Sequence, residues 1–202
     1  MSSRQYKYIR IEIKEVGMAG RPRTIDRDKV LDAAEAVVTR DGASGLTIDA
    51  VAKEAGITKG GVQYAFGSKE NLIRAMIRRW GDTFEEEVMA FAGENPTPET
   101  VILGHIEASR RTDKDEASRS AVMMTALLQQ PDQVAESREW YNSRLQGLDP
   151  SSEHARRARL AFLASEGVFF LKSFNLIDLD DEAWEEVFGD ILALAGPDSA
   201  EK

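Results

Sequence analysis

The sequence predicts an all-α protein of two parts, and three observations lead to this fold class. Apolar residues recur at the 3.6-residue spacing of a single helix face through most of the chain. Glycine, proline and helix-capping residues separate these periodic segments from one another. The period-two alternation that is typical of strands is convincing only in residues 6–13, where it stands alone.

The composition is that of a globular chain with a core of its own. The chain has 202 residues, of which 42% are hydrophobic and 30% charged. It contains no cysteine, which excludes disulfides, thiolate metal sites and cysteine nucleophiles. No segment approaches the roughly 18 uninterrupted apolar residues of a membrane helix, and no signal peptide is recognisable. We therefore expect a cytoplasmic protein without a membrane partner.

The net charge of −9, taken over the whole chain, argues against a nucleic-acid partner, but the charge is unevenly distributed along the sequence. Residues 1–82 carry 15 basic and 11 acidic side chains, whereas residues 83–202 carry 11 basic and 24 acidic ones. Phosphate attracts the first part and repels the second. We expect only the N-terminal part to approach a polyanion.

Four helices are expected in the N-terminal part, and three of them begin at a capping residue. Thr47, Thr58 and Ser68 each stand where a hydroxyl accepts a hydrogen bond from the first turn of the helix. Asp41-Gly42 is expected to end the first helix, and Gly56 to supply a left-handed turn. The expected bounds are 27–40, 47–55, 58–65 and 68–91.

Pro96-Thr97-Pro98 is the clearest break in the chain, and five further helices are expected after it. Their expected bounds are 98–111, 116–129, 132–147, 152–174 and 181–195. We read residues 1–20 as an N-terminal extension, expected to be disordered, because Met18 followed by Arg21-Pro22-Arg23 resembles a natural start and a basic arm. The function expected for the helical residues 21–202 depends on one motif in their N-terminal part.

The motif occupies residues 46–72 and has the physical features of a helix-turn-helix. Val51 and Ala52 are expected to face the core, Ile57 to fill the turn, and Val62 to anchor the following short helix. The outward residues of that helix are then Thr58, Lys59, Gly60, Gly61, Gln63 and Tyr64. A helix of this kind fits the major groove of B-DNA, where its N-terminal residues reach base edges.

The same stretch resembles the TetR family of bacterial transcriptional regulators. The family pattern is matched at Thr47, Val51-Ala52, Ala55-Gly56, Ile57, Thr58, Gly60, Val62, Phe66, Ser68, Lys69 and Leu72. Two departures concern the recognition helix: Gln63 stands where the family commonly has a phosphate-binding tyrosine, and Gly61 adds a second glycine. The Gly60-Gly61 pair indicates either a weak helix start or a close approach of the backbone to DNA.

With this resemblance, the basic and polar residues of the motif become candidate contacts to double-stranded DNA. Lys59 and Gln63 are suited to base edges, and Thr58, Tyr64 and Lys69 to phosphates. Arg21 and Arg23 are expected to reach a neighbouring minor groove. Thr47, Gly60 and Gly61 complete the predicted set. The expected organisation is a helix-turn-helix DNA-binding domain in residues 21–67, a connecting helix in 68–91, and a further domain in 92–202.

The resemblance implies that residues 92–202 form a helical ligand-binding and dimerisation domain. An unidentified small-molecule effector is expected in a pocket drawn from Phe84, His105, Met123, Met124, Leu127, Trp140, Tyr141, Phe162, Glu166 and Phe169. For each residue taken singly, ordinary core packing is the more common role of such a side chain. Glu166 stands out because it is a carboxylate within an apolar helix. We expect it either to bind a cationic or hydroxylated ligand or to pair with an arginine. The predicted homodimer interface consists of Leu160, Leu163, Ala164, Gly167, Val168, Leu171, Trp184, Val187, Phe188 and Ile191.

Enzymatic chemistry finds no support in the sequence. His105 and His154 lie far apart and lack carboxylates at metal-ligand spacing, and no nucleophile or phosphate-loop motif is present. We expect no cofactor, no metal and no catalysis. The sequence favours a repressor that a small molecule releases from a palindromic operator. A ligand-independent or activating regulator, and a helical interaction module that no longer reads DNA, are the alternatives.

Overall fold

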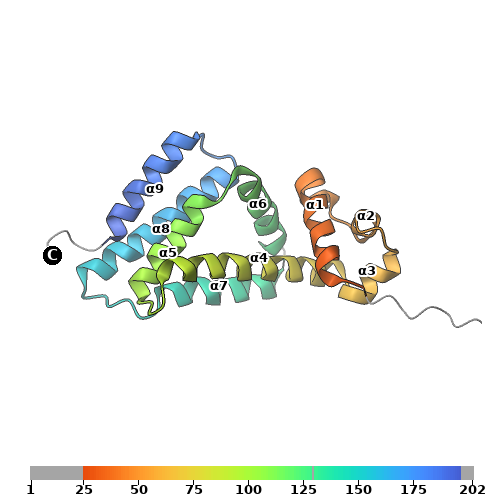
Figure 1. Cartoon of the computed structure of the whole chain (residues 1–202), viewed down its shortest axis with the longest axis horizontal. Helices are drawn as coiled ribbons and strands as arrows, with labels where there is room; N and C mark the ends of the chain where they lie inside the picture. Colours follow the sequence, from red (N-terminus) through yellow and green to blue (C-terminus); the bar gives the residue numbers. More distant parts are fainter. Residues whose placement is uncertain (1–24, 129, 197–202) are drawn as a thin grey trace, which may run out of the picture.

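The computed structural model describes residues 25–128 and 130–196, and within these ranges it is all-helical (Figure 1). This confirms the predicted fold class. The helices are α1 (Arg27–Gly45), α2 (Ile48–Glu54), α3 (Lys59–Phe66), α4 (Lys69–Ala92), α5 (Pro98–Arg111), α6 (Lys114–Leu128), α7 (Pro131–Leu145), α8 (Glu153–Ser173) and α9 (Asp181–Ala195). The predicted N-terminal extension, with its alternating segment 6–13, and both arm residues, Arg21 and Arg23, lie outside the described residues.

The expected caps form. The hydroxyls of Thr47, Thr58 and Ser68 each accept a hydrogen bond from the backbone N–H three residues further on. Gly56 has a φ of 65°, as the turn between α2 and α3 requires. The first helix differs from the expectation, because Gly42 produces a kink at φ 70° and helical structure resumes as far as Gly45.

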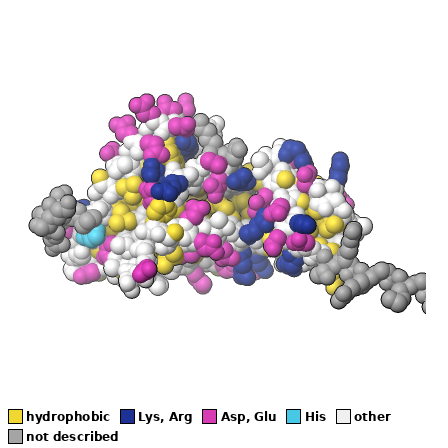
Figure 2. Space-filling model, viewed as in Figure 1, with side chains coloured by type: hydrophobic (Ala, Val, Ile, Leu, Met, Phe, Trp, Pro, Cys, Tyr) yellow, Lys and Arg dark blue, Asp and Glu magenta, His cyan; other side chains and the backbone are white. Residues whose placement is uncertain are grey.

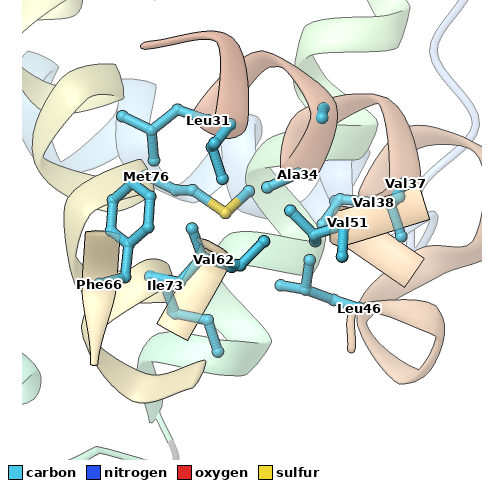
Figure 3. Packing of buried hydrophobic residues seen from close by; sticks show 14 of the residues in the cluster. Leu31, Ala34, Val37, Val38, Leu46, Val51, Val62, Phe66, Ile73 and Met76 are labelled. Atoms are coloured by element: carbon cyan, nitrogen blue, oxygen red, sulfur yellow. The ribbon is translucent and has the colours of Figure 1, made fainter. Parts of the chain in front are cut away.

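Short aliphatic side chains build the core that joins α1, α2, α3 and the beginning of α4 (Figure 3). Val37, Val51 and Val62 are completely buried there, and Phe66 closes the cluster beside Met76. The amphipathic pattern of each helix thus directs one face inward and leaves the polar face in water. Met123 of α6 belongs to the same core, with Val122 and Ala126 packed against it.

A second core joins α5, α8 and α9. Ile102 and Ile106 meet Phe162 and Phe188, all of them buried. α4 packs closely along α5 because Gly104 carries no side chain: a Cβ there would lie 2.4 Å from the carbonyl oxygen of Val88.

The molecule is elongated, with α1–α3 at one end and α9 at the other (Figure 1). α4 runs from the first core past α5 and α7, and α6 lies beside α1. Acidic side chains gather over the region of α9, far from α3 (Figure 2). The described residues 25–82 carry nine basic and nine acidic side chains, so the basic excess predicted for the N-terminal part falls on residues 1–24, outside the described residues.

Candidate nucleic-acid interface and inner cavity

α3 presents a polar face to solvent at the end of the molecule. Lys59, Gly60, Gln63 and Tyr64 are exposed, and the Tyr64 side chain has 86% of its surface free. On the opposite face, Val62 and Phe66 are buried and fix the helix to the first core. The exposed residues lie on the surface of an anchored helix, in a position to meet a groove of DNA.

Gly61 differs from its predicted position. It was expected on the outward face, but a Cβ there would lie 3.3 Å from Cδ1 of Ile25 and 3.4 Å from Cδ1 of Ile57. The glycine therefore lets α3 approach the turn, since a side chain would displace these two residues. Gly60 has open space, with no atom closer than 3.9 Å to its hypothetical Cβ.

An acidic partner holds the lysine of the recognition helix. Nζ of Lys59 lies 2.8 Å from a carboxylate oxygen of Asp49 on α2. Both side chains are more than half exposed, so the pair is a surface ion pair that water and salt weaken. The remaining predicted contacts surround α3: Thr47 and Thr58 are exposed caps, and Lys69 is half-buried at the start of α4.

Helices α4–α8 line a cavity of about 410 Å³ that is partly open to solvent, which we call the inner cavity. Its lining includes eight of the ten predicted pocket residues: Phe84, His105, Met124, Leu127, Trp140, Tyr141, Glu166 and Phe169. Met123 and Phe162 are absent from it. Met123 points the other way, into the first core, and Phe162 lies in the second core behind the ring of His105.

Glu166 is neither free nor paired with an arginine. Its Oε1 lies 2.6 Å from Nε2 of His105, and the hydroxyl of Tyr141 also hydrogen-bonds to this carboxylate. Burial raises the pKa of Tyr141 well above its usual range, and the negative charge of Glu166 raises it further. Tyr141 therefore remains a neutral donor to Glu166.

The cavity also has lining residues that the sequence analysis did not identify. Arg144 is almost fully buried, forms an ion pair with Glu85 and lies 4.6 Å from the ring centroid of Trp140. Trp80 and Arg74 line the cavity from α4. The sequence did contain a pattern that could have identified the α4 side of the cavity: Ile77, Trp80 or Gly81, and Phe84 or Glu85 recur on one helix face. The same spacing is equally typical of core packing.

One face of α8 is apolar and exposed. We call Leu160, Leu163, Gly167 and Leu171 the α8 apolar face; they recur at intervals of three or four residues, and Leu160 is 56% exposed. Ala164, Val168 and Val187 are half-buried against the second core. Trp184, Phe188 and Ile191 lie inside the chain's own core, so their assignment to a dimer interface was wrong.

In the described part of the chain, no cluster of three histidine or carboxylate side chains is arranged to hold a metal ion. None of the described helices has both the length and the apolar character needed to cross a membrane.

Two family models match the chain. The model described as "Bacterial regulatory proteins, tetR family" matches residues 30–76, and "Tetracyclin repressor-like, C-terminal domain" matches residues 99–196. Together they account for well over half of the chain. The first covers the helix-turn-helix and the second most of the inner cavity and α9.

Individual relatives agree with this assignment. The chain is 28% identical over 101 residues to the transcriptional regulator BetI of Paraburkholderia phymatum, covering 48% of this chain and 50% of the relative. It is also 28% identical over 82 residues to the regulator SrpR of Pseudomonas putida, covering 41% and 38%. The matches thus span at most about half the length of these two relatives.

Solved structures share the fold. A transcriptional regulator from Rhodococcus sp. RHA1 superposes with a TM-score of 0.64 at 19% identity, covering 85% of this chain and 96% of the other. The multidrug binding protein EbrR, complexed with imidazole, superposes with a TM-score of 0.60 at 21% identity, covering 82% and 88%. From its two matched family models and its all-helical fold, the chain belongs to the TetR family of helix-turn-helix transcriptional regulators.

Proposed function

We propose that this regulator is a ligand-responsive repressor that binds a palindromic operator as a homodimer and leaves it when a small molecule enters the inner cavity. The proposal assigns DNA binding to residues 21–67, connection to α4, and effector binding and dimerisation to residues 92–202. The anchored recognition helix α3, with Lys59, Gln63 and Tyr64 exposed on one face, is the observation that carries it.

A dimer is supported by the α8 apolar face. Leucine side chains that stay exposed along two turns or more of a helix favour burial against a second copy. The small Gly167 at the middle of this face permits close packing of two helices. A two-fold dimer places its two α3 helices about one DNA turn apart, roughly 34 Å, to match the half-sites of a palindrome.

Two helices support coupling between the cavity and the DNA-binding end. α4 contributes Met76 to the first core and, one to two turns later, Trp80 and Phe84 to the cavity. α6 places Met124 in the cavity and Met123 in the first core. A ligand that moves either helix displaces groups in both places, so it can favour one spacing of the recognition helices over another.

The response to a small molecule draws further support from the neighbouring fold. EbrR was solved in complexes with imidazole, ethidium, proflavin and malachite green. The inner cavity of this chain, about 410 Å³ with aromatic walls, is within the size range of small-molecule sites. We therefore assign it to an organic effector.

The test is a gel-shift titration on DNA from upstream of the protein's own gene, at two salt concentrations. Lys59→Ala/Gln63→Ala is expected to lose about 2–6 kcal/mol of specific binding, since each base contact contributes about 1–3 kcal/mol. The matched control, Arg138→Ala/Gln146→Ala, likewise removes one exposed basic residue and one exposed glutamine, in and just after α7, and should bind as the parent does. Weak, salt-sensitive binding that is equal in all three proteins would favour the interaction module that no longer reads DNA.

A further inference from the structure

The charged groups of the inner cavity are distributed unevenly along it. The cavity follows α4 from Arg74 to Glu85, a distance of about 16 Å at 1.5 Å per residue. Arg74 and Arg78 line the end near the DNA-binding helices, while His105 and Glu166 line the other end. Arg144 is paired with Glu85 and adds no net charge. The end with Arg74 and Arg78 thus favours an anionic ligand, and the end with Glu166 favours a cationic one. The charge that is less exposed to water has the stronger influence on a ligand.

Glu166 is the most deeply placed carboxylate that has no arginine or lysine partner among the described lining residues. Its side chain is 15% exposed, whereas Arg78 and Glu136 are exposed to water. Water screens Arg78 and Glu136, while the half-buried Arg74 lies towards the opposite end of the cavity. The side chain that contacts the Glu166 carboxylate most closely is His105.

His105 is held beside Glu166 by the aromatic rings that surround it. It is 1% exposed and surrounded by the rings of Phe84, Trp140 and Phe162 at centroid distances of 4.9–5.7 Å. Its Nδ1 finds no hydrogen-bond partner among the described residues. Among the described lining residues, Glu166 thus contacts an imidazole and a phenol but no guanidinium or ammonium group.

Resting on the proposed function, we infer that the effector is an organic cation with an apolar body, whose ammonium or amidinium group binds Glu166. Tyr141 and His105 contact the carboxylate, and the ring of Phe84, which lines the same cavity, offers an apolar and cation-attracting neighbour for the ligand. The apolar body extends along α4 towards Met124. A cation at this point provides the ammonium or guanidinium partner that Glu166 lacks among the described lining residues.

The test compares three ligands of one shape in calorimetric titrations of the full-length protein at neutral pH. 4-Phenylbutylamine is a cation, 4-phenylbutan-1-ol is neutral and 4-phenylbutyrate is an anion. We expect the amine to bind at least tenfold more tightly than the alcohol. Glu166→Gln should abolish this preference while changing the affinity for the alcohol less than twofold. In the matched control, Glu139→Gln alters an exposed carboxylate of α7 outside the cavity lining and should leave the preference intact.

The inference fails if the amine and the alcohol bind equally, if no member of the series binds, or if the anion binds best because of Arg74 and Arg78. Thermal unfolding of Glu166→Gln followed by circular dichroism checks the fold. Tyr141→Phe, which retains the carboxylate, should keep the preference. Operator release is measured separately. Binding through Glu166 without release would overturn the proposed function alone, and release that is unaffected by Glu166→Gln would overturn this inference alone.

Discussion

The DNA-binding end and the inner cavity are built in opposite ways from the same kind of helix. At the DNA-binding end, short aliphatic residues fill the inside, and the candidate functional side chains Lys59, Gln63 and Tyr64 stand outside. Around the cavity the candidate functional groups point inward: His105 is buried and the side chain of Glu166 is 15% exposed. A surface that meets DNA can be polar and solvated, whereas a small-molecule site must remove water from its ligand.

This difference has a consequence for stability. The first core contains hydrophobic side chains only, so each of its contacts can serve folding. The cavity places an ion pair, a carboxylate and an unpartnered imidazole nitrogen close to the second core. Such groups cost free energy on burial, and α5, α8 and α9 must offset that cost through close packing. Substitutions that loosen the second core should therefore lower the free energy of unfolding most clearly, and they test the difference between the two regions most directly.

The largest expected effect is at Phe188, which we had placed in a dimer interface. It is completely buried within one chain, so Phe188→Ala should lower the free energy of unfolding by about 3–5 kcal/mol. Leu163→Ala changes an exposed residue of the α8 apolar face and should leave the fold of one subunit almost unaffected while weakening the dimer. Urea unfolding and sedimentation at two protein concentrations separate the two effects. An unchanged dimer in Leu163→Ala would contradict this assignment.

A smaller effect is expected from a glycine in each region. Gly104→Ala places a Cβ 2.4 Å from the Val88 carbonyl oxygen and should destabilise the protein by about 1–3 kcal/mol in urea unfolding. Gly60→Ala enters open space and should instead stabilise it by about 0.4–1 kcal/mol. Operator affinity then decides the role of Gly60. A loss means that the backbone approaches DNA closely, and no change means that the glycine only weakens the helix start.

The smallest effect is expected at the ion pair of the recognition helix. Asp49→Asn releases Lys59 and removes a negative charge from the candidate interface. Because a surface pair contributes about 0.2–1 kcal/mol, we expect operator binding to tighten by about 1.5- to 5-fold in a gel shift, with little change in stability. Glu54→Gln is the control, since Glu54 lies on the same helix but pairs with Arg40. An equal gain in both variants would indicate a general charge effect.

The helix-turn-helix could be predicted from the sequence because its interactions are local. Thr47, Gly56 and Thr58 act on backbone within three residues of themselves, so their residue types and spacing were sufficient. The position of Gly61 was mistaken because its neighbour Ile25 lies far outside the motif and touches it only in the folded structure. Arg21 and Arg23 remain predictions.

The sequence alone determined the all-helical class, the caps and the charge difference between the two ends, since these depend on composition and on neighbours along the chain. Only the tertiary structure decided which apolar residues of α8 and α9 face the core and which face solvent. It also decided that Glu166 meets His105, 61 residues away, rather than an arginine. Periodicity identifies an apolar stripe but not the element that covers it, because packing partners are chosen by the whole fold.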